Sequence, residues 1–278
     1  MYQKVINNIK LPEIMGILNL TEDSFSDGGY YLSDAAALEH AGKLVRDGAT
    51  ILDLGAESTR PGSMEISAEL EWQRLAPVLQ ALKEKHPHIQ ISIDTQKAIV
   101  AKQAIALGAD IINDISALQY DPDMAEVLST AKHVKVVLMH MQGRPQTMQF
   151  APRYTDVVKE VYRFLEQRIN YAEQCGITKD RIIVDPGIGF GKTLQHNLLL
   201  LKHLDVFHEL GCAVLLGASR KRFIDQIYPA DVHHRIGGSL ASAMLACLCG
   251  VQMIRVHDVL EHAQFIRTLA ALNTVGEL

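Results

Sequence analysis

Three observations predict a (β/α)8 barrel. Eight short apolar runs recur along the 278 residues, about 34 residues apart, which is the length of one strand-helix unit. The runs are continuously apolar, as in strands that helices cover on both faces. Segments with helical periodicity separate the runs. We therefore expect a TIM barrel that forms one domain over residues 1–278. The alternative is an open doubly wound sheet. Eight evenly spaced strands fit a closed barrel better than such an open sheet.

Each predicted strand ends at a polar residue or a glycine. The strands cover 14–18, 49–52, 90–93, 110–112, 135–139, 181–184, 213–216 and 252–254. The residues that follow them are Asn19, Asp53, Asp94, Asn113, His140, Asp185, Gly217 and Arg255. Active sites of such barrels lie at the carboxyl ends of the strands. We therefore expect these side chains to converge on one site.

Four of the intervening helices have recognisable ends. They are expected over 34–46, 68–85, 97–107 and 154–175. Ser33 and Ser67 precede the first two and are candidate N-caps. Glycine or proline follows each helix, at Gly48, Pro87, Gly108 and Gly176. Both residue types are common just beyond a helix C-terminus.

The composition excludes several classes of protein. Hydrophobic residues make up 48% of the chain and the formal net charge is −5, whereas nucleic-acid-binding domains are usually basic. Four scattered cysteines are too few for a disulfide scaffold and lack the spacing of a zinc site. There is no signal-peptide pattern and no apolar run long enough to cross a membrane. We expect a cytoplasmic protein that binds neither nucleic acid nor membrane.

The first two loops after strands, residues 20–29 and 55–62, are expected to overhang the barrel mouth. The first contains the Gly28-Gly29 turn, and in the second Arg60 precedes Pro61, which would fix a positive charge on a bent loop. Two adjacent loops of this kind predict a lid over the site.

The glycine-rich segment 185–193 is not a nucleotide-binding loop. A Walker A motif would need glycine where Pro186 stands, and the G-x-G-x-G spacing is not a dinucleotide fingerprint. We expect a loop whose backbone approaches a flat ligand. Further along, Arg220, Lys221 and Arg222 would open a helix, where cations oppose the helix dipole and favour an anionic or electron-rich ligand.

Two further groups of strand-end residues suggest specific chemistry. Arg255 and His257, two apart on the last strand, would point the same way and could clamp a phosphate. Asp94 and Asp185, with Asn113, could accept hydrogen bonds from an aminopyrimidine edge, because buried carboxylates need partners. The 12 histidines show no H-E-x-x-H spacing, but Mg²⁺ needs few protein ligands when it binds a substrate phosphate. Asn19 is the candidate ligand.

The chain resembles the dihydropteroate synthase family along nearly its whole length. The resemblance rests on motifs in the family's order: IMGILNLT (14–21), DSFSDGG (23–29), DLGAESTRPG (53–62), SIDT (92–95), IND (112–114), DPGIGFGK (185–192), SRK (219–221) and RVHD (255–258). It implies a homodimeric (β/α)8 barrel. It also implies a transferase of folate biosynthesis and a sulfonamide target. The implied reaction joins 6-hydroxymethyl-7,8-dihydropterin pyrophosphate to 4-aminobenzoate, with Mg²⁺, giving 7,8-dihydropteroate and pyrophosphate.

The resemblance also implies a role for each matching residue. The pterin would contact Asp94, Asn113, Asp185 and Lys221. The pyrophosphate would contact Asn19, Arg255 and His257, with Asn19 on the Mg²⁺. The 4-aminobenzoate would contact Phe25, Asp27, Thr59, Arg60, Pro61, Phe190 and Ser219. The residues implied to be catalytic are Asp94, Asp185, Lys221, Arg255 and His257. Some members carry serine where this chain has Arg222, so the contacts to the benzoate carboxylate stay open.

Three other functions compete with this interpretation. A pterin-binding methyltransferase would share the pterin pocket and pass a methyl group to a corrinoid, but would not need the Thr59-Arg60 segment of the lid. A catalytically silent paralogue would bind pterin without turnover. A Schiff-base aldolase would use Lys221 as its nucleophile.

Overall fold

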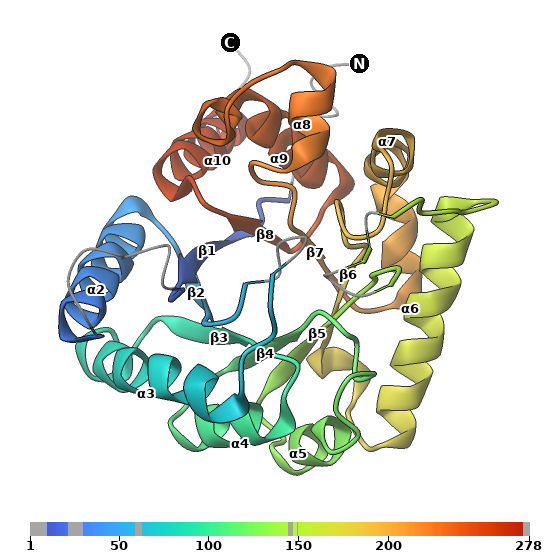
Figure 1. Cartoon of the computed structure of the whole chain (residues 1–278). Helices are drawn as coiled ribbons and strands as arrows, with labels where there is room; N and C mark the ends of the chain where they lie inside the picture. The colour runs from blue at the N-terminus through green and yellow to red at the C-terminus, as the bar shows by residue number, and fades with distance from the viewer. Residues whose placement is uncertain (1–9, 22–29, 59–62, 144–146, 149, 275–278) are drawn as a thin grey trace.

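The computed structural model shows a closed barrel of eight parallel strands in the order β1 to β8 (Figure 1). It describes residues 10–21, 30–58, 63–143, 147–148 and 150–274. The strands are β1 (Glu13–Asn19), β2 (Ile51–Gly55), β3 (Gln90–Asp94), β4 (Ile111–Asp114), β5 (Lys135–Met139), β6 (Ile182–Asp185), β7 (Ala213–Leu216) and β8 (Met253–Val256). β1 pairs with both β2 and β8, so the sheet has no edge. The predicted barrel is confirmed.

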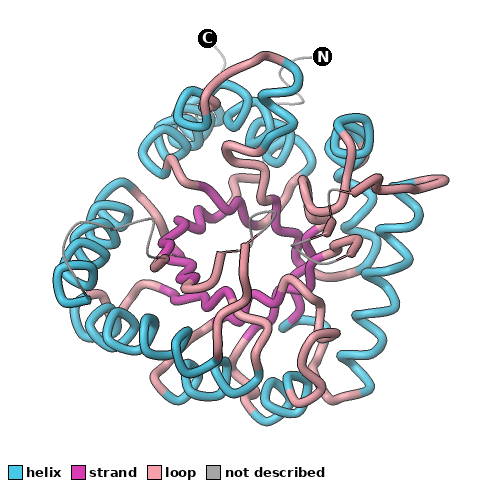
Figure 2. Tube along the Cα trace, in the orientation of Figure 1, coloured by secondary structure: helices cyan, strands magenta, loops and turns pink. Residues whose placement is uncertain are grey.

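Helices surround the ring of strands (Figure 2). They are α2 (Tyr30–Asp47), α3 (Ala68–Lys85), α4 (Ala98–Ala106), α5 (Met124–Thr130), α6 (Val157–Gln174), α7 (Leu194–Lys202), α8 (Arg222–Ile227), α9 (Ile236–Cys249) and α10 (Val259–Thr274). Short 3₁₀ helices occupy Lys179–Arg181, Leu204–Leu210 and Val232–His234. No helix in the described part of the chain is long and apolar enough to span a bilayer.

Several of the expected element ends need correction, including those of β4 and β8, which continue to Asp114 and Val256 and so contain Asn113 and Arg255. α2 begins at Tyr30, so Ser33 lies inside the helix and is not its N-cap. α6 begins at Val157, three residues later than expected, because the Asp156 side chain caps it by accepting from the Lys159 amide at 3.2 Å. β2 continues to Gly55, so Asp53 lies within the strand and not after it. The Ser67 cap is confirmed: its hydroxyl accepts from the Leu70 amide.

The barrel interior has an apolar layer with a polar layer above it. The apolar layer consists of Met15, Ile51, Ile111, Val137, Ile183, Leu215 and Met253. Side chains two residues apart on a strand point to the same face. The next inward positions are therefore Ile17, Asp53, Asn113, Met139, Asp185, Gly217 and Arg255. The apolar layer closes the barrel below, and the polar groups lie toward the carboxyl ends of the strands.

Candidate active site

Arg255 is at the centre of the polar layer. Its Nε donates to Asp53 Oδ2 at 2.6 Å and its Nη2 donates to Asp94 Oδ2 at 2.9 Å. The Asp53 side chain is fully buried, and the Arg255 side chain is 22% exposed. Burial lowers the pKa of Arg255, but Asp53 and Asp94 outweigh that effect and raise it. Arg255 therefore remains a cation that joins β8 to β2 and β3.

Asp94 has an unusual protonation equilibrium. Burial, opposed by the Arg255 guanidinium and reinforced by nearby Asp53, raises the pKa of Asp94 to about 7. The protonated carboxyl is therefore favoured by the fold up to neutral pH. This group contributes stability that is fully present below its ordinary pKa of 3.8 and is lost as the pH rises through about 7.

A pH dependence of stability is expected from Asp94. The free energy of unfolding of wild type, minus that of Asp94→Asn, should fall as the pH rises from 4 to 8, by at most about 1.4 kcal/mol per pH unit. Urea titrations at four pH values measure this difference, and subtracting the variant removes the contribution of all other groups. A difference that rises or stays flat over this range contradicts the assignment.

Asp185 and Lys221 meet beside Gly217. A Cβ at Gly217 would lie 3.6 Å from Asp185 Oδ2 and 3.8 Å from Lys221 Nζ, so both groups approach its backbone. Asp185 Oδ1 accepts from the Gly187 amide at 2.7 Å. Burial raises the pKa of Asp185, with Lys221 opposing. Burial lowers the pKa of Lys221 to about 8, with Asp185 opposing. The predicted convergence of these two residues with Arg255 is confirmed.

The glycine-rich loop after β6 is fixed from several sides. Lys221 Nζ donates to the Ile188 carbonyl and lies 4.6 Å from the centre of the Phe190 ring. The Gly189 amide donates to Asn197 Oδ1 at 2.7 Å. A Cβ at Gly187, whose φ is 68°, would come within 1.9 Å of the His140 carbonyl oxygen, so only glycine fits. Phe190 is thereby held beside Lys221.

Sequence reasoning missed the contact between Lys192 and His140. The buried Lys192 Nζ lies 2.9 Å from His140 Nδ1, and it donates to the Phe190 carbonyl at 2.9 Å and to the His140 carbonyl at 3.3 Å. Burial lowers the pKa of Lys192 well below its usual range and that of His140 to about 2. The pair ties the glycine-rich loop to the end of β5. His140 was visible as a strand end, but nothing in the sequence indicated its partner.

The prediction that Arg255 and His257 lie on one strand is wrong, whereas their shared contact with a phosphate stays a prediction. β8 ends at Val256, and His257 turns toward the loop after β7. Its backbone amide donates to Ser219 Oγ at 3.2 Å, and its Nδ1 lies 3.2 Å from the same oxygen. Burial lowers the pKa of His257 to about 3, and Arg255 acts in the same direction. His257 is therefore a neutral hydrogen-bonding group.

Arg220, Lys221 and Arg222 were expected to open the helix after β7. Among these three, only Lys221 contacts another residue of the predicted site. Arg220 has a φ of 58° and forms an ion pair with Asp258, and Arg222 is exposed at the start of α8. Asn19 is half-buried at the end of β1. The predicted lid residues Phe25, Asp27, Thr59, Arg60 and Pro61 lie outside the described residues.

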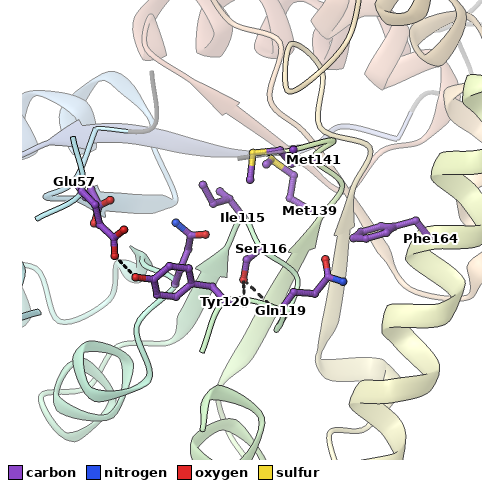
Figure 3. A pocket seen from close by; sticks show the side chains of 11 residues that line it. Glu57, Ile115, Ser116, Gln119, Tyr120, Met139, Met141 and Phe164 are labelled. Carbon is purple, nitrogen blue, oxygen red and sulfur yellow. Dashed lines mark hydrogen bonds between the residues drawn. The ribbon is translucent and has the colours of Figure 1, made fainter. Parts of the chain in front are cut away.

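A cavity of about 360 Å³ lies at the ends of β4 and β5 (Figure 3). Its apolar wall is formed by Ile115, Met139, Met141 and Phe164. Its polar side includes Glu65, which accepts a hydrogen bond from the Tyr120 hydroxyl. Met139 is the strand-register partner of Asp185, so the cavity borders the polar layer.

Comparison with known proteins identifies relatives along almost the whole chain. The family model of the pterin binding enzymes matches residues 15–257. The dihydropteroate synthase of Escherichia coli K12 is 46% identical over 266 residues, which are 96% of this chain and 93% of that protein.

The chain is also similar to solved structures of dihydropteroate synthases. The dihydropteroate synthase of Yersinia pestis in a sulfonamide drug complex superposes with a TM-score of 0.89 at 41% identity, covering 95% of each chain. That of Xanthomonas albilineans with 4-aminobenzoic acid also has a TM-score of 0.89, at 42% identity, covering 96% of this chain and 94% of that one.

Proposed function

The chain belongs to the pterin-binding enzyme family, as a dihydropteroate synthase, and from this membership we propose how its strand-end residues share the two substrates. It is a transferase of folate biosynthesis that condenses 6-hydroxymethyl-7,8-dihydropterin pyrophosphate with 4-aminobenzoate to give 7,8-dihydropteroate and pyrophosphate. One observation carries the assignment of roles: hydrogen-bond acceptors and cations share one inward layer above an apolar floor.

We assign the pterin ring to the deepest part of this layer. Asp94, Asn113 and Asp185 supply acceptor oxygens for the ring N–H groups, and Lys221 supplies a donor. All four side chains come from the carboxyl ends of strands or the loop directly after one. Buried acceptors favour a ligand with matching donors, because an unmatched buried polar group is costly. This set therefore selects a flat ring with an aminopyrimidine edge.

We assign the pyrophosphate to Arg255, His257 and Asn19. Arg255 provides the charge, and His257, being neutral, contributes a hydrogen bond. No group of three or more His, Cys, Asp or Glu side chains in the described ranges could hold a metal ion. The single amide oxygen of Asn19 fits Mg²⁺, which commonly takes its other ligands from phosphate and water. Bound there, Mg²⁺ supplies positive charge next to the leaving group.

The 4-aminobenzoate is assigned to the rim formed by Phe190 and Ser219, and to contacts with Phe25, Asp27, Thr59, Arg60 and Pro61, which lie outside the described residues. Phe190 is fixed by the glycine-rich loop and offers an apolar face. Ser219 already contacts His257, so the rim adjoins the pyrophosphate position. Arg222 is exposed at the start of α8, three residues after Ser219, and we assign it as a cation for the benzoate carboxylate.

We propose a dissociative displacement. The bond between the pterin methylene carbon and the pyrophosphate oxygen breaks, and both electrons leave with pyrophosphate. The neutral aniline nitrogen then bonds to that carbon and releases one proton to water. Arg255 stabilises the charge that develops on the leaving group, and Asp94 and Asp185 stabilise the cationic pterin. The aniline nitrogen needs orientation more than a base.

We propose that the enzyme is a cytoplasmic homodimer. All four cysteines are free thiols, as in a reducing compartment. Exposed apolar side chains lie on α7, at the C-terminal end of α8 and on α9, three elements of which α7 contacts the other two; they are Leu198, Ile227, Tyr228, Leu245 and Leu248. Exposed apolar side chains on adjacent elements favour a protein partner over solvent.

Turnover tests the proposed function. We expect pyrophosphate release when the protein is mixed with the pterin pyrophosphate, Mg²⁺ and 4-aminobenzoate, and inhibition by a sulfonamide that competes with 4-aminobenzoate. Omission of 4-aminobenzoate is the control. Pterin binding without release would indicate a silent paralogue. Methyl transfer to a corrinoid, or trapping of Lys221 by borohydride with a carbonyl substrate, would indicate the other two alternatives.

A further inference from the structure

Asp53 is a fully buried carboxylate that none of the proposed steps uses. It lies on β2, directly above Ile51 of the apolar layer, with an exposed fraction of 0%. It bonds to side chains from two other strands, Arg255 on β8 and Asn113 on β4. Because it is sealed from the mouth, it acts on substrate only through these neighbours.

We infer that Asp53 is a positioning residue. It determines whether the Oδ1 or the Nδ2 atom of the Asn113 side chain points toward the pterin. The inference rests on the proposed role of Asn113 in pterin binding. It adds a specificity determinant below the residues that touch the substrate.

The hydrogen-bond chemistry of Asn113 carries the inference. Its Nδ2 lies 3.5 Å from Asp53 Oδ1 and 3.3 Å from Asp53 Oδ2. An ionised carboxylate only accepts, so only the nitrogen of the amide can face it. Rotation of the amide by half a turn would place oxygen against oxygen in a buried site. Asp53 therefore turns Asn113 Oδ1 away from itself, as an acceptor for a ring N–H.

Arg255 holds the Asp53 side chain in place. Its Nε donates to Asp53 Oδ2 at 2.6 Å, while its Nη2 is held by Asp94 at 2.9 Å. A charge-assisted bond of this kind is about twice as strong as a neutral one. Asp53 on β2 thus couples the cation proposed for pyrophosphate, on β8, to the amide proposed for the pterin, on β4, which are alternate strands of the barrel.

Asp53→Asn should reverse the Asn113 amide. The amide introduced at position 53 would accept from Arg255 through an oxygen in the place of Asp53 Oδ2, and its NH₂ would take the place of Asp53 Oδ1, which lies 3.5 Å from Asn113 Nδ2, so that two donors would face each other. Asn113 would then have to present its oxygen to that NH₂ and its own NH₂ to the ligand. The exchange Asp53→Asn with Asn113→Asp lets the NH₂ at position 53 donate to a carboxylate at position 113, which again offers an acceptor to the pterin.

Calorimetric binding of unphosphorylated 6-hydroxymethyl-7,8-dihydropterin tests this. We expect Asp53→Asn to weaken binding by roughly 10- to 100-fold, the effect of one mismatched buried hydrogen bond. The exchange variant should recover most of the affinity. The KM for 4-aminobenzoate should not change in either. The matched control is Asp110→Asn, which loses a carboxylate at the opposite end of β4 and should keep wild-type affinity.

Unchanged affinity in Asp53→Asn, or a folded exchange variant without recovery, overturns the inference. Wild type that binds no pterin would instead overturn the proposed function. If Asp53→Asn does not fold, neutron diffraction of the wild-type pterin complex decides the question. We expect the deuterons of Asn113 Nδ2 to point at Asp53 and its oxygen at the ligand. The reverse orientation contradicts the inference.

Discussion

Replacing Asp185 with asparagine is expected to lower kcat by roughly 10²- to 10³-fold, the typical effect of losing one preorganised electrostatic group. The Asp185 carboxylate is buried, beside Lys221, and accepts from the Gly187 amide at 2.7 Å. Asparagine has nearly the same shape and can still accept that bond, so the fold should survive. What is lost is the negative charge that stabilises the cationic pterin in the transition state.

Steady-state kinetics with far-UV circular dichroism measure both parts of this prediction. The matched control is Asp180→Asn, a carboxylate that is exposed at the amino-terminal end of β6 and should leave kcat unchanged. Near-normal turnover of Asp185→Asn would remove Asp185 from the mechanism. Loss of turnover together with unfolding would show that its role is structural.

Arg255→Ala is expected to lower the free energy of unfolding by about 3–5 kcal/mol near pH 8, because it leaves two buried carboxylates without their shared cation. Asp53 is fully buried and Asp94 is 10% exposed. The loss should be smaller near pH 5, where the raised pKa of Asp94 lets this group become neutral. The loss of unfolding free energy should also be smaller in an Asp53→Asn background, because one of the two carboxylates left without a cation is then absent.

The same variant tests the pyrophosphate assignment. Arg255→Ala should weaken the binding of the pterin pyrophosphate much more than that of the unphosphorylated pterin, because only the former bears the charge that Arg255 offsets. Chemical denaturation and calorimetry provide the two sets of values. Equal losses of affinity for both ligands would argue against this assignment, and an unchanged unfolding free energy would argue against the ion-pair network.

The barrel could be predicted because it rests on repetition. Each strand is an apolar run, and each predicted run contains or overlaps an observed strand. Strand ends such as Asp94 and Asp185 were therefore located by chain order alone. Asp53 was misplaced because β2 continues past the run of apolar residues. The signal that could have located its side chain is alternation: Asp53 follows Ile51 by two residues, so both face inward.

Turn geometry could not be predicted from sequence. Arg220, Lys221 and Arg222 are three adjacent basic residues that the sequence alone does not distinguish. In the structure, Arg220 has a φ of 58° and its side chain forms an ion pair with Asp258, whereas Lys221 lies at the site. The contact of Lys192 with His140 is similar, because 52 residues separate the two and a buried lysine gives no periodic signal. Such contacts depend on how loops fold back, which apolar patterning does not specify.

A crystal structure with 6-hydroxymethyl-7,8-dihydropterin pyrophosphate tests the central claim, that the polar layer above the apolar floor is the substrate site. We expect the aminopyrimidine edge to meet Asp94, Asn113 and Asp185, and the pyrophosphate to meet Asn19, Arg255 and His257. A pterin bound instead in the cavity lined by Ile115, Met141 and Phe164, with Arg255 out of reach of the pyrophosphate, would contradict the account.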